Sequence, residues 1–316
     1  MSAYNDMLFG CIPNAENPKL LSDLKSRFEV AWDAEDKPSL CSWESLKSHL
    51  EEKAETIQKL KSAGKYRFWW ETCRKLGLNP EKLLVPSQGN IGSCAGVSYF
   101  DRCYLITVLH QIAEGSEQQI EPVNALVTWL ISKGWSIRGG QTISAVVMEG
   151  IETGVFPASM VGNYSAGWYD KRTAQDHAAD AEKRQMGACL VPDSEDKFDA
   201  LTLALQGGKA VEIGNSKAVN GYDTDSNGVT VLTLGGSWSH ATMFSEILDI
   251  NGNPYYRWEN THDLICESEF GPRFGGLMTP DGTKRFLDCT FCDLAVVTYA
   301  ESPYDTTIKP TLLPEI

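Results

Sequence analysis

The sequence predicts an α+β protein with a helical half and a sheet half. Helical periodicity dominates residues 42–154, whereas strand patterns begin only after residue 207. The turn-forming pairs Asn251-Gly252 and Asp281-Gly282 fall among the strand patterns and suit hairpins. Because the helices come first and the antiparallel strands later, the two kinds of element are expected to separate into two lobes.

The helical patterns have recognisable starts and ends. Ser42 is a suitable N-cap for a helix over residues 42–64, which ends at Gly64. An apolar helix follows Ser93, and one face of it carries Val97, Phe100, Tyr104 and Val108. Further helical patterns cover residues 66–76, 123–133 and 142–154, and residues 165–206 are polar and partly helical.

The strand patterns are short and are separated by turn-forming residues. They cover residues 209–214, 228–236, 240–250, 254–260 and 293–301. Residues 302–316 contain three prolines and are expected to form an extended tail.

A boundary near residues 85–87 divides the chain into parts. Residues 1–86 are expected to form a mostly helical N-terminal extension, and residues 87–301 the main domain. The extension is either an accessory layer or an inhibitory pro-segment. The accessory layer is favoured, because no pro-segment motif is visible.

Charge and composition exclude several function classes. The chain has 316 residues, of which 42% are hydrophobic, and a net charge of -14, which disfavours non-specific nucleic-acid binding. No apolar run reaches the roughly 18 residues of a membrane span, and the N-terminus shows no secretory signal. The nine cysteines are therefore expected to be reduced. These features favour a cytoplasmic or virion-associated protein, of bacterial or phage type.

Cys94 lies where a glycine-rich loop turns into the apolar helix. A thiolate rather than a thiol attacks carbonyl carbon, and an unperturbed cysteine is only a few per cent ionised at neutral pH. The N-terminus of a helix and a nearby imidazolium both favour the thiolate. Cys94 is therefore a candidate nucleophile, although a lone cysteine at a helix start is more often a buried structural thiol.

The string Gln88-Gly89-Asn90-Ile91-Gly92-Ser93-Cys94 resembles the segment around the nucleophile in papain and the cathepsins. That family has Gln, Gly, any residue, Cys, Gly, Ser and Cys there, so only Ile91 departs. The resemblance spans about residues 84–300. It implies a papain-like two-lobed fold, with a helical left lobe and an antiparallel β-sheet or barrel as right lobe. It also implies that Gln88 and the Cys94 backbone N–H donate hydrogen bonds to the oxyanion.

The departure at Ile91 has a counterpart later in the chain. In the family, the cysteine at this position bridges to another just before a Gly-Gly pair, and here Ile137 stands at that partner position. Loss of both ends fits a chain that matures in a reducing compartment. The resemblance implies that Gly139 and Gly140 bind substrate, with Gly140 lining the cleft and pairing its backbone with an extended peptide. Without the resemblance, Gly139-Gly140 is a simple turn.

The remaining catalytic candidates are a histidine and an asparagine. The family places its base about 130–150 residues after the nucleophile, at the start of a strand, and His240 fits both conditions. The family's Asn-Ser-Trp-Gly motif aligns with Asn260-Thr261-His262-Asp263, so Asn260 is expected to orient the His240 ring. His262 replaces the shielding Trp. It could shield as a flat ring, act as a second base, or mark relaxed selection on catalysis.

The resemblance thus implies a thiol endopeptidase that acts on polypeptides without a cofactor or metal. Cys289 and Cys292 form a CxxC pair without the second pair that a structural zinc needs. The loop over residues 220–227 lacks the bidentate Glu of a calcium site. A cell-wall amidase or peptidase also uses Cys then His, but generally lacks a residue like Gln88. The alternative is a papain-fold structural or binding module with little or no activity, such as a phage or virion component.

Overall fold

The computed structural model describes residues 11, 42–64, 71–72, 77, 92–113, 123–136, 138–161, 171–261, 275–291 and 294–300. Most of the predicted helix over residues 66–76 and the whole predicted tail over residues 302–316 lie outside the described residues. Within the described ranges, no helix combines the length and the apolar character that a membrane crossing requires.

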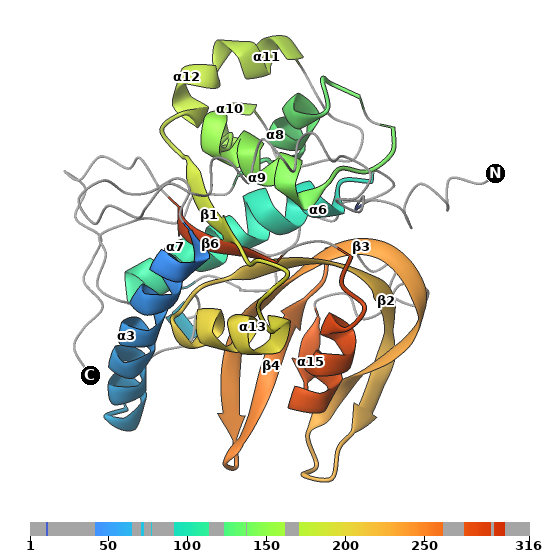
Figure 1. Cartoon of the computed structure of the whole chain (residues 1–316). Coiled ribbons are helices and arrows are strands. Elements are labelled where there is room, and N and C mark those ends of the chain that lie inside the picture. Colours follow the sequence, from blue (N-terminus) through green and yellow to red (C-terminus); the bar gives the residue numbers. More distant parts are fainter. Residues whose placement is uncertain are drawn as a thin grey trace.

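The helical half lies at the top of Figure 1. It contains α8 (Ala125–Ser132), α9 (Ile143–Glu152), α10 (Ala158–Val161), α11 (Lys171–Asp176) and α12 (Ala178–Ala181). The two longer helices begin at side-chain caps: Asn124 accepts from the Leu126 N–H before α8, and Thr142 accepts from the Ala145 N–H before α9. Each cap satisfies a backbone N–H that has no partner within its own helix.

A central helix runs between the two halves (Figure 1). It begins as α6 (Cys94–Gly96), continues as the π-helix η2 (Val97–Cys103) and ends as α7 (Tyr104–Ala113). The predicted apolar face is buried, but nearly every other residue from Cys94 to His110 is buried as well. The central helix is therefore enclosed on all sides, which explains why its sequence is more apolar than one amphipathic face requires.

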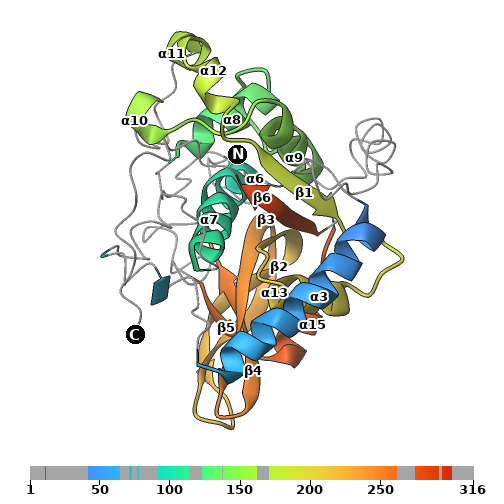
Figure 2. The ribbon, with the colours of Figure 1, turned by 90° about the vertical axis from the view of Figure 1, so that its left-hand side faces the viewer.

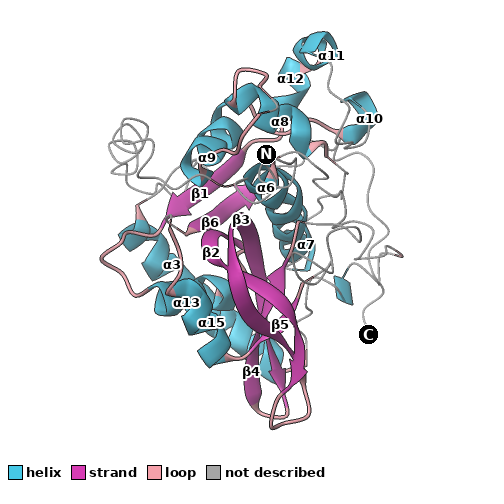
Figure 3. Cartoon of the chain, turned by 90° about the vertical axis from the view of Figure 1, so that its right-hand side faces the viewer, coloured by secondary structure: helices cyan, strands magenta, loops and turns pink. Residues whose placement is uncertain are grey.

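The sheet has six antiparallel strands, shown in magenta in Figure 3. The strands are β1 (Met186–Leu190), β2 (Val211–Thr224), β3 (Thr230–Ile250), β4 (Asn253–Glu259), β5 (Gly276–Met278) and β6 (Ala295–Ala300), in the spatial order β1-β6-β2-β3-β4-β5. Asn251 and Gly252 connect β3 to β4 with φ angles of 55° and 79°. Two successive positive φ values suit a tight hairpin turn, as predicted for this pair. With helices and this sheet, the predicted α+β class is confirmed.

Both faces of strand β3 are buried over residues 240–246. Ala241 and Met243 pack in the core that surrounds the central helix. Trp238 and Phe244 pack in a second core, which includes residues of α3 (Trp43–Ser62), α13 (Lys197–Gln206) and α15 (Pro280–Leu287). Figure 2 shows α3 and α13 on the outer side of this second core. The strand that carries the candidate base is therefore held between two apolar layers.

Three strand and turn predictions are wrong. The patterns over residues 228–236 and 240–250 merge into one strand of 21 residues, β3, because the pairing with β2 resumes at Ser237 after an irregularity at Gly235-Gly236. The short strand β1 lies inside the stretch predicted as polar and partly helical, and it is stabilised by pairing with β6. Asp281-Gly282 lies in α15 rather than in a hairpin, since the Thr279 hydroxyl caps this helix by accepting the Gly282 N–H at 3.1 Å.

Candidate active site

Cys94 is the first residue of α6 and is completely buried. Its thiol faces strand β3, where the backbone N–H of Ala241 donates to the Cys94 Sγ at 3.3 Å. Ala241 directly follows His240. The fold therefore brings the start of the central helix to the segment of β3 that carries the candidate base, although the two lie 147 residues apart along the chain.

His240 is paired with Asn260. The Nε2 of His240 lies 3.0 Å from the Asn260 Oδ1, and both side chains are buried. The same Oδ1 accepts the backbone N–H of Thr261 at 2.8 Å, which identifies this atom as the amide oxygen. Because an amide oxygen only accepts hydrogen bonds, Nε2 carries the proton and donates. In the neutral ring Nδ1 is then the basic nitrogen.

Two further contacts of His240 were not predicted from the sequence. The Thr261 Oγ1 lies 3.2 Å from the His240 Nε2, so it shares this proton with Asn260. The indole of Trp238 meets the imidazole edge to face, with ring centroids 4.8 Å apart. Behind it, Trp258 stacks on Trp238 at 6.2 Å. Period-two alternation along β3 is the signal that places Trp238 beside His240.

Burial keeps both candidate groups uncharged. It raises the pKa of the Cys94 thiol to about 12, although the Ala241 N–H bond works in the other direction. Burial also lowers the pKa of His240 to about 4, against the effect of the Asn260 hydrogen bond. At neutral pH this structure therefore holds a thiol and a neutral imidazole, because a buried charge is poorly solvated.

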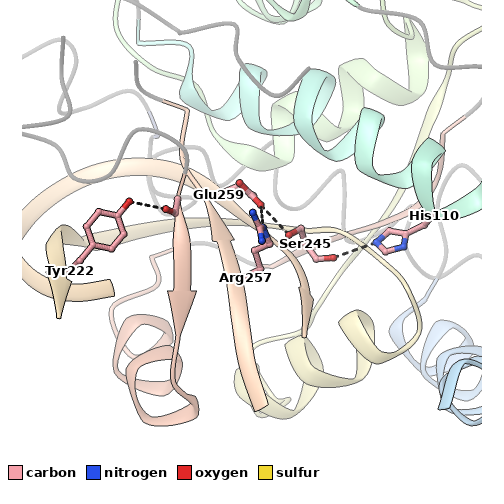
Figure 4. A network of polar contacts seen from close by, with 6 residues as sticks. His110, Tyr222, Ser245, Arg257 and Glu259 are labelled. Atoms are coloured by element: carbon pink, nitrogen blue, oxygen red, sulfur yellow. Dashed lines mark hydrogen bonds and ion pairs between the residues drawn. The ribbon is translucent and has the colours of Figure 1, made fainter. Parts of the chain in front are cut away.

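A network of polar contacts supports the strand end that carries Asn260 (Figure 4). The preceding residue, Glu259, accepts from the Arg257 Nε at 3.0 Å and from the Ser245 hydroxyl at 3.3 Å. The Ser245 backbone oxygen in turn lies 3.4 Å from the Nε2 of His110, on α7. This network links the central helix to β3 and β4, and its members are buried except for the half-buried Arg257.

The predicted substrate-binding glycines lie on the loop between α8 and α9. Gly139 has a φ of +68°, a conformation that glycine adopts without strain. Gln141, at the end of this loop, forms a parallel β-bridge with Cys11. Cys11 also contacts the sheet half, since its N–H donates to the Ser239 oxygen at 3.5 Å and its oxygen accepts from the Ser239 hydroxyl at 2.5 Å. The backbone at Cys11 thus joins the helical half to the residue that precedes His240.

Several sequence predictions lie outside the described residues or gain a structural explanation. Gln88, His262 and Cys292 are outside the described residues. In the loop considered for calcium, Asp225 accepts the N–H groups of Asn227 and Val229, both at 2.9 Å, and the Tyr255 hydroxyl at 2.6 Å. Asp225 therefore organises a turn. No group of three or more potential metal-ligating side chains comes together within the described ranges.

Comparisons of the chain with known proteins gave structural matches only. No family model and no curated protein matches the sequence. The structure is similar to that of xylellain, a cysteine protease from Xylella fastidiosa, with a TM-score of 0.47 and 15% identity over 72% of this chain and 88% of that one.

Two procathepsin structures were also found. ProCathepsin B S9 from Trypanosoma congolense gives a TM-score of 0.46 and 14% identity, covering 74% of this chain and 75% of that one. Procathepsin L 3 from the larval midgut of Tenebrio molitor gives a TM-score of 0.40 and 10% identity, covering 90% of this chain and 99% of that one. In each of the three comparisons the sequence identity is low.

Proposed function

We propose that the chain is a thiol endopeptidase in which Cys94 is the nucleophile, His240 the base and Asn260 the residue that orients it. The observation that carries this proposal is the hydrogen bond from the His240 Nε2 to the Asn260 Oδ1 at 3.0 Å. This bond fixes the tautomer of His240 in which Nδ1 is basic. The residue that follows His240, Ala241, donates its backbone N–H to the Cys94 thiol.

The proposed reaction has two stages. His240 takes the proton of the Cys94 thiol, and the Cys94 thiolate attacks the peptide carbonyl. The resulting oxyanion is stabilised by the Cys94 backbone N–H and the Gln88 side chain. The His240 imidazolium then protonates the leaving amine, so that the C–N bond breaks and a thioester forms. His240 next takes a proton from water, and the hydroxide attacks the thioester. The acid product leaves, and the thiol and the neutral imidazole are restored.

We also propose that the protein in this structure is latent. Cys94 and His240 are buried, and burial disfavours their charged forms. Cys11 contacts Gln141 on one side and Ser239 on the other, which is the path that an extended polypeptide substrate would take past the proposed Gly139-Gly140 site. On this proposal the part of the extension 1–86 that carries Cys11 acts like a pro-segment, while α3 is an accessory layer packed in the second core of the peptidase domain at residues 87–301. Residues 302–316 are proposed to form a tail.

The same burial favours a second candidate function. A completely buried thiol with a pKa near 12 is a poor nucleophile, so the fold could serve as a structural or binding module, for example in a virion. The two functions differ in whether displacement of the N-terminal segment produces an activated thiolate at Cys94.

Covalent labelling separates these functions. The full-length chain is treated with an epoxysuccinyl thiol-protease inhibitor, with and without limited proteolysis of its N-terminal segment, and adducts are mapped by mass spectrometry. The endopeptidase proposal predicts one adduct per chain, on Cys94, which forms faster after proteolysis. His240→Ala abolishes this adduct, because the thiolate loses its partner.

Cys289 supplies the internal control, because it is a partly exposed thiol outside the proposed site. Iodoacetamide should label Cys289 equally in the wild type and in His240→Ala. If iodoacetamide labels Cys289 while the proteolysed chain forms no inhibitor adduct on Cys94, the endopeptidase proposal is wrong and the module is favoured.

A further inference from the structure

The loop that precedes α9 is attached to the end of α8 by a lysine. α8 ends at Ser132 with Lys133 as its C-cap, and the chain then reverses through Gly134 and Trp135, both with positive φ. This reversal returns the loop to the helix end, where the Lys133 Nζ donates to the backbone oxygens of Arg138 at 2.5 Å and Gly139 at 2.7 Å.

Lys133 is itself held in place. Its ammonium lies over the Trp129 ring, 4.7 Å from the ring centroid, which is within the range of a cation–π contact. A positive charge at a helix C-terminus also interacts favourably with the helix dipole. Partial burial lowers the pKa of Lys133 to about 8, so the group is mainly charged at neutral pH. One side chain therefore makes two charge-assisted hydrogen bonds to neighbouring peptide units.

A second side chain attaches the other end of the same loop. The Gln141 Nε2 donates to the Ser132 oxygen at 3.0 Å, and its Oε1 accepts the Thr142 N–H at 2.9 Å. The backbone of Gln141 is the part that pairs with Cys11. The loop over residues 138–141 is thus fixed at both ends to α8, and its edge already pairs with extended backbone.

We propose that Lys133 is a positioning residue for peptide binding, which holds the backbone over residues 138–141 in the geometry that an extended polypeptide requires. Without the ammonium, the oxygens of Arg138 and Gly139 would turn to water, because both residues are exposed. The fold would remain stable, while the backbone over residues 138–141 would lose its fixed geometry. The part of this inference that concerns substrates rests on the proposed endopeptidase function.

Hydrogen–deuterium exchange of the full-length chain tests the structural part, whatever the activity. In Lys133→Met, exchange at residues 138–142 should rise about tenfold at pH 7, because two charge-assisted bonds are lost. Lys133→Arg should restore most of the protection. Lys183→Met is the matched control, since Lys183 is an exposed lysine that pairs with Asp180 and should leave exchange at this loop unchanged.

Labelling of Cys94 after limited proteolysis of the N-terminal segment tests the part that concerns substrates. The rate constant for a peptidyl epoxysuccinate divided by that for iodoacetamide should fall about tenfold in Lys133→Met, because only the peptidyl reagent uses the loop edge. This ratio also cancels any change in access to Cys94. Exchange and a rate ratio that both match the wild type would overturn the inference. A proteolysed wild type in which Cys94 reacts with neither reagent would contradict the proposed function, while the exchange data would still decide the role of Lys133.

Discussion

The buried imidazole of His240 should make the folded protein sensitive to mild acid. Its pKa is about 4 in the fold and ordinarily 6.5, so the unfolded chain binds the proton first as the pH falls. The contribution to stability is complete above pH 6.5 and is lost as the pH falls through 6.5 toward 4. At pH 5 the loss amounts to about 2 kcal/mol, from the difference in proton binding between the two states.

Replacement of His240 by Gln, which does not titrate, isolates this effect. The free energy of unfolding is measured by denaturant titration of both proteins at pH 7.5 and pH 5. The difference in the free energy of unfolding between variant and wild type is first measured at pH 7.5. At pH 5 this difference should move by about 2 kcal/mol in favour of the variant. Other titrating groups affect both proteins and cancel. A difference that is equal at the two pH values would refute the assignment of a buried, neutral His240.

Two other predictions concern the core around the site. Burial raises the pKa of Glu246 to about 8. Glu246→Gln should therefore stabilise the protein by up to about 3 kcal/mol at pH 7 and by nothing below pH 4.5, which thermal melts at both pH values would detect. A gain in stability that does not depend on pH would contradict this prediction. A Cβ at Gly96 would lie 2.6 Å from the Trp129 Cβ. Gly96→Ala should therefore lower the free energy of unfolding by about 1–3 kcal/mol in a denaturant titration, and it should slow the labelling of Cys94. An unchanged denaturation midpoint would show that α6 and α8 separate freely.

Local sequence was sufficient where the signal lay within a few residues. Ser42 acts as the expected helix cap, as its side-chain bond shows, and Asn251-Gly252 forms the expected hairpin turn. The α+β class followed from the order of the periodic segments. These features depend on the conformational preferences of single residues and short repeats, which do not need the rest of the fold.

Tertiary structure decided the features that the sequence did not reveal. Asp281-Gly282 is an exception, because the Thr279 cap and Pro280 at the first helical position are local signals of a helix start that outweigh its turn chemistry. The single long β3 depends on its pairing with β2, which no local pattern encodes.

The candidate site divides in the same way. The resemblance to papain and the cathepsins indicated His240 and Asn260, and the structure pairs their side chains; their catalytic roles stay predictions. The contact of Trp238 with His240 depends on both residues lying on one strand, whereas the sequence predicted a strand only from residue 240. The attachment of Lys133 to Gly139 required the reversal after α8, which depends on a positive φ at Trp135 that its residue type does not favour.

The burial of both faces of β3 restricts how this molecule can open. A shift of His240 would also move Ala241 and Met243 in one core and Trp238 and Phe244 in the other. The packing on both faces therefore holds this part of the strand rigidly. We therefore expect that a rearrangement which admits a ligand moves the segments that cover Cys94 and His240, and not β3 itself. On the proposal that the chain is latent, the covering segment and the event that displaces it can change in evolution without any change in the two cores around β3.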